Sequence, residues 1–254
     1  MKRRNNFFSI LPPFMDAPMN HPRSAIKTFG TAVFILKCIF LGTRFDQGFA
    51  LDNEYCEALK KTIEAFQDRV LIEMDGNFGQ ATRQKFFVNF GIDLDAIPHS
   101  VLRLPDVALQ PNGELIIWPP GQIINSSKET KTSGGLYKIL PPYMDYEGVH
   151  VGAAGKTSGP SVFVVKCLLI GTEYYKGYLL DTTFCDGLAK TISAFQKHSG
   201  IDADGCFGQG TRACFRKITG RNLEEVPRQV LAQTDLAIQP DGYVITWPPK
   251  LVLA

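Results

Sequence analysis

Two stretches, DGNFGQATRQKF at residues 75–86 and DGCFGQGTRACF at residues 204–215, decide the fold of this chain. They lie one fixed period apart, since 75 + 129 = 204, and they share an Asp-Gly-x-Phe-Gly turn followed by Gln, Thr, Arg and Phe. A glycine-rich turn that leads into such a run predicts a tight loop at the start of a helix. The chain therefore contains the same loop and helix start twice.

The likeness continues outward at the same offset without a gap. Upstream, ILPPFMD at 10–16 matches ILPPYMD at 139–145, and downstream IIWPP at 116–120 matches ITWPP at 245–249. A period this long indicates duplication of a whole folding unit rather than a short solenoid repeat. The sequence predicts two copies of one module.

The copies correspond to predicted domains at 8–120 and 136–250. A chain of 254 residues is long enough for two domains, and a copy of about 110 residues is large enough to bury its own core. Between them, residues 121–135 read GQIINSSKETKTSGG, a polar composition typical of a flexible linker.

Each copy carries the pattern of three helices, within residues 30–92 and 159–221. The first helix has one apolar face and is predicted to stop at a glycine, an Asp is predicted to cap the second, and the third follows the glycine-rich turn and stops at another glycine. In the order of the copies, the residues are Val33, Leu36, Phe40 and Gly42, matched by Val162, Val165, Leu169 and Gly171; Asp52, Leu59, Ile63 and Phe66, matched by Asp181, Leu188, Ile192 and Phe195; and Gly91, matched by Gly220.

A β-hairpin is predicted after the helices. ALQPNGELIIW at 108–118 and AIQPDGYVITW at 237–247 carry turn residues between two short apolar runs. The paired prolines of the N-terminal segments exclude a helix there and favour an extended arm laid against that hairpin. The predicted fold class is α+β: two tandem three-helix modules, each with a C-terminal β-hairpin and an extended N-terminal arm.

Composition excludes several classes of protein. The net charge of +2 is too small for a nucleic-acid-binding face, and no apolar run approaches a membrane span, so neither partner is expected. The basic residues Lys2, Arg3 and Arg4 precede FFSILPPF, whose two prolines do not fit a signal peptide. A cytosolic protein, or one that leaves the cell without a signal, is expected.

The six cysteines leave two possibilities open. Cys38 and Cys56 recur as Cys167 and Cys185, which could form one disulfide in each module or remain buried thiols. No Cys or His spacing predicts a zinc site, and no other metal or cofactor is expected.

The helical portions carry a recognisable order of motifs. In the second copy they are Val162, Val165 and Leu169; then Asp181, Phe184, Leu188, Ile192, Phe195 and Gln196; then Gly200, Ile201, Asp204, Gly205, Gly208 and Thr211. This order resembles the peptidoglycan-binding-like domain of bacterial and phage cell-wall hydrolases, over about half of the chain. The sequence departs from the family at Lys37 and Lys166, where the family has Gln, and at Cys56 and Cys185, where it has Gly.

The resemblance implies a module that docks on the glycan and stem peptide of peptidoglycan. Sugar rings bind on aromatic faces and carboxylates bind Arg or helix N-termini, so the candidate ligand-binding residues are Phe45, Phe49, Tyr174, Tyr175 and Tyr178 of two aromatic loops, with Gln80, Arg83, Gln209 and Arg212 at the start of the third helices. The alternatives are that the aromatics cap the helical core, that Thr82 caps its helix, and that Arg83 pairs with a neighbouring acid.

Catalytic patterns are weak. The sequence has no HExxH or GxSxG, its Asp-x-Asp-Gly lacks the Glu of a calcium loop, and its Gly-Lys-Thr lacks the first glycine of a phosphate loop. We therefore expect no enzyme but a cell-wall-binding protein of phage lysis or of a virion, bivalent through its linker. The alternatives are a structural virion protein with the same fold and a wall hydrolase with an unrecognised site.

Overall fold

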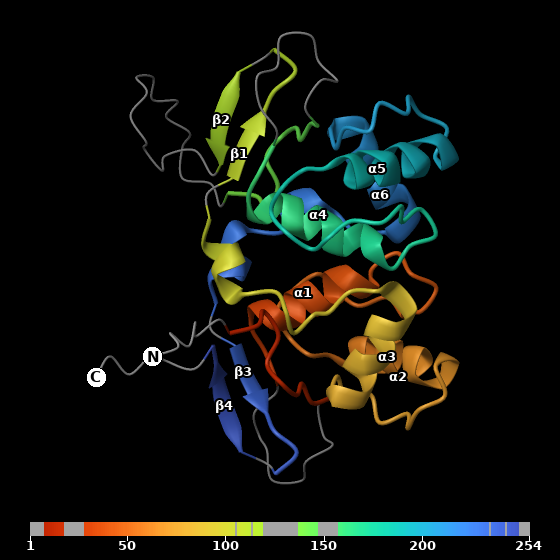
Figure 1. Cartoon of the computed structure of the whole chain (residues 1–254), viewed down its shortest axis with the longest axis vertical. Helices are drawn as coiled ribbons and strands as arrows, with labels where there is room; N and C mark the ends of the chain where they lie inside the picture. Colours follow the sequence, from red (N-terminus) through yellow and green to blue (C-terminus); the bar gives the residue numbers. More distant parts are fainter. Residues whose placement is uncertain are drawn as a thin grey trace, which may run out of the picture. The chain divides into compact units, whose positions relative to one another are not determined.

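The computed structural model describes residues 8–17, 28–104, 106–112, 114–118, 137–146, 157–233, 235–241 and 243–248 (Figure 1). Over these residues it holds six α-helices and two separate two-stranded hairpins, so its class is α+β. The chain divides into two compact units, unit 1 from Met1–Val101 with Val230–Ala254, and unit 2 from Leu102–Gln229.

Unit 1 contains the first three helices and the last hairpin. The helices are α1 (Thr31–Phe40), α2 (Glu57–Arg69) and α3 (Gln80–Phe90), and the strands are β3 (Asp235–Ile238) and β4 (Val244–Trp247). In Figure 1 the blue β3–β4 hairpin accordingly belongs with the red and orange helices.

Unit 2 contains the other three helices and the first hairpin. These are α4 (Pro160–Ile170), α5 (Asp186–His198) and α6 (Gln209–Thr219), with β1 (Asp106–Leu109) and β2 (Leu115–Trp118). A short 3-10 turn at Leu223–Glu225 also belongs to unit 2. Two more, at His99–Arg103 and Arg228–Ala232, span the positions at which the chain passes from one unit to the other.

The two hairpins are exchanged between the sequence copies. The hairpin at 106–118 follows the first three helices in the chain but belongs to unit 2, whereas the hairpin at 235–247 belongs to unit 1. Each of the two sequence repeats, 8–120 and 136–250, therefore contributes its helices to one unit and its hairpin to the other. Residues 121–135 lie outside the described residues, and in chain order they fall within the range of unit 2.

The predicted arm contacts a hairpin, but not the hairpin of its own copy. In unit 1 the Trp247 indole donates to the Ser9 carbonyl at 2.7 Å, and in unit 2 the Trp118 indole donates to the Lys138 carbonyl at 2.9 Å. The expectation of an arm on its own hairpin is wrong, because local sequence specifies an apolar hairpin face without specifying which copy of the core covers it.

The first helix of each unit is buried on every side. All residues of α1 and all residues of α4 are buried, including Lys37 and Lys166. Each lysine forms an ion pair with an Asp, Lys37 with Asp52 at 2.6 Å and Lys166 with Asp181 at 2.7 Å. A buried ammonium needs such a partner, since an unpaired charge in the core is very costly.

These ion pairs correct one prediction. Asp52 and Asp181 do not cap the second helices, whose N-cap residues are Cys56 and Cys185 with no side-chain cap bond. The two carboxylates instead accept from buried lysines, a partner that local sequence does not reveal. Thr82 likewise caps no helix, because the N-cap of α3 is Gly79.

The predicted helix ends agree with the structure. α1 ends at Phe40 before Gly42, whose φ is 73°, and α3 and α6 end before Gly91 and Gly220, both with φ 70°. Gly171 follows α4 as predicted, although its φ of −85° is not left-handed. No helix within the described ranges is long and apolar enough to cross a membrane.

Candidate functional site

The glycine-rich turn before α3 is built around the buried side chain of Gln67. Its amide nitrogen lies 2.7 Å from Asp75 Oδ1, 3.0 Å from Thr82 Oγ1 and 3.0 Å from the Asn77 carbonyl. Its amide oxygen accepts from the Gly76 N–H at 2.9 Å. One side chain therefore ties the end of α2 to both ends of the turn.

The corresponding Gln196 makes the same contacts in unit 2, with Asp204 at 2.7 Å, the Cys206 carbonyl and Thr211 at 2.9 Å, and the Gly205 N–H at 2.8 Å. The residues that the two copies share at this turn thus serve the fold.

Arg83 and Arg212, two of the candidate ligand-binding residues, are each only 7 % exposed and are engaged within the protein. Arg83 donates to Asp95 at 2.6 Å and to the Pro12 carbonyl, and its guanidinium lies 5.3 Å from the centre of the Phe78 ring. The alternative given for Arg83, pairing with a neighbouring acid, is thus observed.

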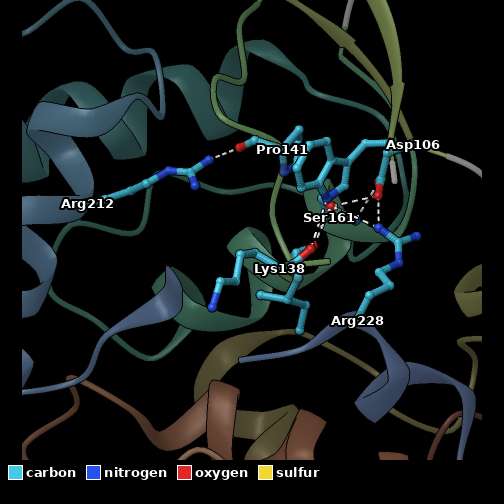
Figure 2. Close-up of polar contacts among 8 residues, drawn as sticks. Asp106, Lys138, Pro141, Ser161, Arg212 and Arg228 are labelled. Carbon is cyan, nitrogen blue, oxygen red and sulfur yellow. Dashed lines mark hydrogen bonds and ion pairs between the residues drawn. The ribbon is translucent and has the colours of Figure 1, made fainter. Parts of the chain in front are cut away.

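Arg212 has the equivalent partners in unit 2. It donates to Glu224 and to the Pro141 carbonyl, the latter visible in Figure 2, and lies over the Phe207 ring. Each arginine therefore holds the proline arm against the third helix. Gln80 and Gln209, the first residues of α3 and α6, are exposed.

The aromatic loops are mostly part of the cores. Phe45 and Phe49 are 8 % and 1 % exposed, and Phe45 packs edge-on against Phe66. Tyr178 is 7 % exposed and donates to the Lys166 carbonyl at 2.8 Å. These three residues therefore cap the helical core, as the alternative interpretation proposed.

Tyr174 and Tyr175 are half-buried and keep part of their rings at the surface. Tyr174 packs against Phe195 and His198 with ring centres 5.5 and 5.3 Å apart. The Tyr175 hydroxyl donates to the Tyr178 carbonyl at 3.1 Å. Of the five aromatic candidates, these two present the most accessible surface.

A surface depression of about 560 Å³ lies beside the glycine-rich turn of unit 1. Its lining comes from the arm, α2, the turn and the β3–β4 turn, namely Phe14, Lys60, Glu64, Met74, Asp75, Asn77 and Pro240. It therefore combines an aromatic ring with a cation, two carboxylates and an amide.

The geometry of the depression depends on Gly76 and Gly79. Gly76 has φ +69°, and a Cβ there would lie 2.5 Å from Lys60 Cγ, so this glycine lets the lysine stem cross the turn. A Cβ on Gly79 would lie 2.8 Å from the Phe14 ring. Lys60 Nζ lies 3.9 Å from Glu64 Oε1, and both side chains keep about a quarter of their surface exposed, at 23 % and 27 %.

The equivalent positions of unit 2 hold different side chains. Adding 129 converts Lys60, Glu64 and Met74 into Ala189, Ser193 and Ala203. The arm ring is kept as Tyr143, which lies against Gly208 as Phe14 lies against Gly79. Cys206 replaces Asn77, and its thiol lies 2.8 Å from Asp145 Oδ1. Unit 2 therefore lacks the counterparts of both members of the Lys60–Glu64 pair.

Sequence reasoning missed this depression, because its lining comes from four segments that are distant in the chain. A usable signal was nevertheless present. Positions 60, 64, 74 and 77 differ between copies although the turn that they surround is the same.

A second polar cluster anchors the β1–β2 hairpin in unit 2 (Figure 2). Asp106, which is fully buried, accepts from the Ser161 N–H and hydroxyl at 2.7 Å each and from Arg228. The Ser161 Oγ also lies 2.8 Å from the Ile139 carbonyl oxygen. Burial raises the pKa of Asp106, which Arg228 and Ser161 partly oppose. The Ser161 hydroxyl is fully buried and serves the fold.

The equivalent acid in unit 1 is Asp235, which is 1 % exposed and accepts from the Ala32 N–H at 2.6 Å. His99 stands where unit 2 has Arg228, with its Nε2 at 4.0 Å from Asp235 Oδ2. Burial raises the pKa of Asp235 to about 7. The buried carboxyl of unit 1 therefore faces an imidazole, where that of unit 2 faces a guanidinium.

None of the six cysteines is part of a disulfide. Cys38 is fully buried, and burial raises its pKa, while Lys37 lowers it. The buried-thiol alternative therefore describes Cys38 and Cys167, and no disulfide joins them to Cys56 or Cys185. No group of three or more His, Cys, Asp or Glu side chains that could hold a metal is found in the part of the chain that the structure describes.

Comparisons with known proteins add no relative. No family model matches the chain, no curated protein matches it, and no solved structure matches its fold.

Proposed function

We propose that the protein is a non-catalytic cell-wall-binding protein, built from two tandem peptidoglycan-binding-like modules, and that unit 1 takes part of peptidoglycan in the depression beside its glycine-rich turn. The observation that carries the proposal is the composition of that depression, which joins Phe14 to Lys60, Glu64, Asp75 and Asn77. The order of motifs in each copy supports it.

The chemistry of the depression suits a wall fragment. An aromatic ring offers a face for a sugar, Lys60 offers an ammonium to a stem-peptide carboxylate, and the acids offer acceptors to an amine or hydroxyl. The Lys60–Glu64 pair is partly exposed and separated by 3.9 Å, so it contributes little to stability and can be opened at small cost by a ligand.

In this proposal unit 2 makes a second contact of different chemistry. Its half-buried Tyr174 and Tyr175 offer ring surface, and Gln209 is exposed at the start of α6. Two weak contacts on one polymer give higher avidity than either alone, by a factor of about 10² or more when both are engaged. Such a bivalent binder fits a phage lysis or virion protein.

The test is sedimentation of the intact chain with purified sacculi. Wild-type protein is expected to sediment, and Lys60→Glu is expected to weaken binding about tenfold, the equivalent of one lost charged contact. Lys61→Glu is the matched control, since Lys61 is the exposed neighbour on α2 and the change in net charge is the same. Equal behaviour of the two variants, or no sedimentation of the wild type, contradicts the proposal.

A structural docking role is the second candidate. It is favoured by apolar side chains on the surface of α3, where Phe87 and Val88 are 50 % and 71 % exposed. In the same assay this role predicts no binding to sacculi by any variant.

A further inference from the structure

Each hairpin completes the helical unit of the other sequence copy through backbone pairing. In unit 2, Val107 and Ser158 exchange two N–H to carbonyl bonds of 2.8 Å, and Ser158 also bridges to Thr183. In unit 1, Leu236 and Phe29 do the same at 2.9 and 3.0 Å. Adding 129 to position 29 gives 158, so the two pairings are equivalent.

The hairpins also cap the buried first helices. The N-cap residues Gly30 and Gly159 provide no side-chain acceptor. The hairpins supply the acceptors instead. Asp235 of β3 accepts from the Ala32 N–H at 2.6 Å, and Asp106 of β1 accepts from the Ser161 N–H at 2.7 Å. A buried helix start needs such a partner, and a carboxylate there is also favoured by the helix dipole.

Ring and indole contacts hold the second strand at the same end of each hairpin, since Trp118 pairs with Asp106 and Trp247 with Asp235. Trp247 donates to Ser9 and packs edge-on against Phe8 with ring centres 5.7 Å apart. Trp118 donates to Lys138 and packs edge-on against Tyr137 at 6.3 Å. Strand pairing, helix cap and arm contact are thus all supplied to each helical core by the other half of the chain.

We propose that the two halves of the chain are mutual folding partners, which stay bound through reciprocal hairpin exchange when the connector at 121–135 is cut. A cut there leaves a first half that supplies the helices of unit 1 and the hairpin of unit 2, and a second half that supplies the reverse. Neither half then contains one complete unit. On this proposal the covalent connection through residues 121–135 is not needed to keep the two halves together.

The first experiment places a protease site within residues 121–135 and cuts the folded protein. Light scattering of the native, cut protein is expected to give one species at the 28.2 kDa mass of the whole chain. Two separate, folded halves overturn the proposal.

The second experiment distinguishes exchange from simple contact between halves. The pair Val107→Cys with Ser158→Cys joins the halves in the exchanged arrangement, because these two positions face each other in an antiparallel bridge. After oxidation and cutting, a non-reducing denaturing gel is expected to show the full-length mass, collapsing to half-size bands on reduction.

The matched control is Val107→Cys with Phe29→Cys. Position 29 is the equivalent of position 158, so this pair would cross-link only if the hairpin lay on its own copy. Both positions lie in the first half, so a gel of the cut chain gives half-size bands whether or not they cross-link. The readout is therefore the number of thiols that the first half loses on oxidation, counted by alkylation and mass, and no loss is expected for this pair. A cross-link within the first half, with none between Val107→Cys and Ser158→Cys, contradicts the exchange.

Discussion

Positions 99 and 228 are one period apart, and the difference between them changes the electrostatics of a buried acid. Arg228 donates to Asp106 in unit 2, whereas His99 stands 4.0 Å from Asp235 in unit 1. A guanidinium stays charged throughout the accessible pH range, and an imidazole does not. The pKa of Asp235 is therefore raised to about 7 by burial, which only the Ala32 hydrogen bond opposes.

We expect this acid to make unit 1 less stable as pH rises from about 4 to about 7. Folded Asp235 keeps a proton that the unfolded chain, with a pKa of 3.8, has already released. The folded state therefore binds more protons in this range, and the free energy of unfolding falls with pH, by at most roughly 4 kcal/mol.

Urea unfolding of wild type and Asp235→Asn between pH 4 and pH 8 measures the effect. The difference between the two proteins is expected to change across this range and then to level off. His99→Arg is expected to reduce the pH dependence, because it restores the partner present in unit 2. A constant difference between wild type and Asp235→Asn would refute the assignment.

At the scale of elements, each third helix is joined to the proline arm by one arginine. Arg212 on α6 reaches Glu224 and the Pro141 carbonyl, and its guanidinium lies 5.8 Å from the centre of the Phe207 ring. A planar fork makes both contacts at once, which a lysine cannot do. This geometry explains why Arg occurs at the same place in both copies.

We expect Arg212→Ala to destabilise the protein by about 2–3 kcal/mol, since it leaves a buried carbonyl without its charged donor. Arg212→Lys is expected to recover only part of this. Arg216→Ala is the control, because Arg216 is exposed on the same helix and its loss should cost less than about 0.5 kcal/mol. Chemical denaturation measures all three, and equal losses for Arg212→Ala and Arg216→Ala would contradict a bracing role.

At the scale of the whole molecule, the exchange of hairpins means that a change near one end of the chain acts on helices near the other. Asp235 and Leu236 belong to the second sequence copy but contact Ala32 and Phe29. Unit 1 depends on them for a helix cap and a strand pairing.

A chain that ends at Gln233 is therefore expected to lose amide protection in Thr31–Phe40 and to retain it in Pro160–Ile170. Hydrogen exchange with peptide-level readout measures both helices in one experiment. A chain that ends at Pro248, which keeps the hairpin, is the control and should resemble wild type. Loss of protection in α4 instead of α1 would show that the hairpin serves its own copy.

Much of the local structure was predictable from sequence. Helix ends at Gly42, Gly91 and Gly220 follow from left-handed glycines, and the hairpin turns follow from Pro-Asn-Gly and Pro-Asp-Gly. Signals of this kind act within a few residues. The roles of Asp52 and Asp181 were mistaken because their partners, Lys37 and Lys166, lie 15 residues away on another element.

The sequence by itself determined the repeat, the α+β class and the kind of element each segment forms, because these depend on periodicity and on turn chemistry. Only the tertiary structure decided which hairpin covers which core and where the charged depression lies. The two copies share their core pattern, so each hairpin meets two cores of the same kind, and local sequence does not distinguish between them. The choice depends on how the whole chain is connected in space.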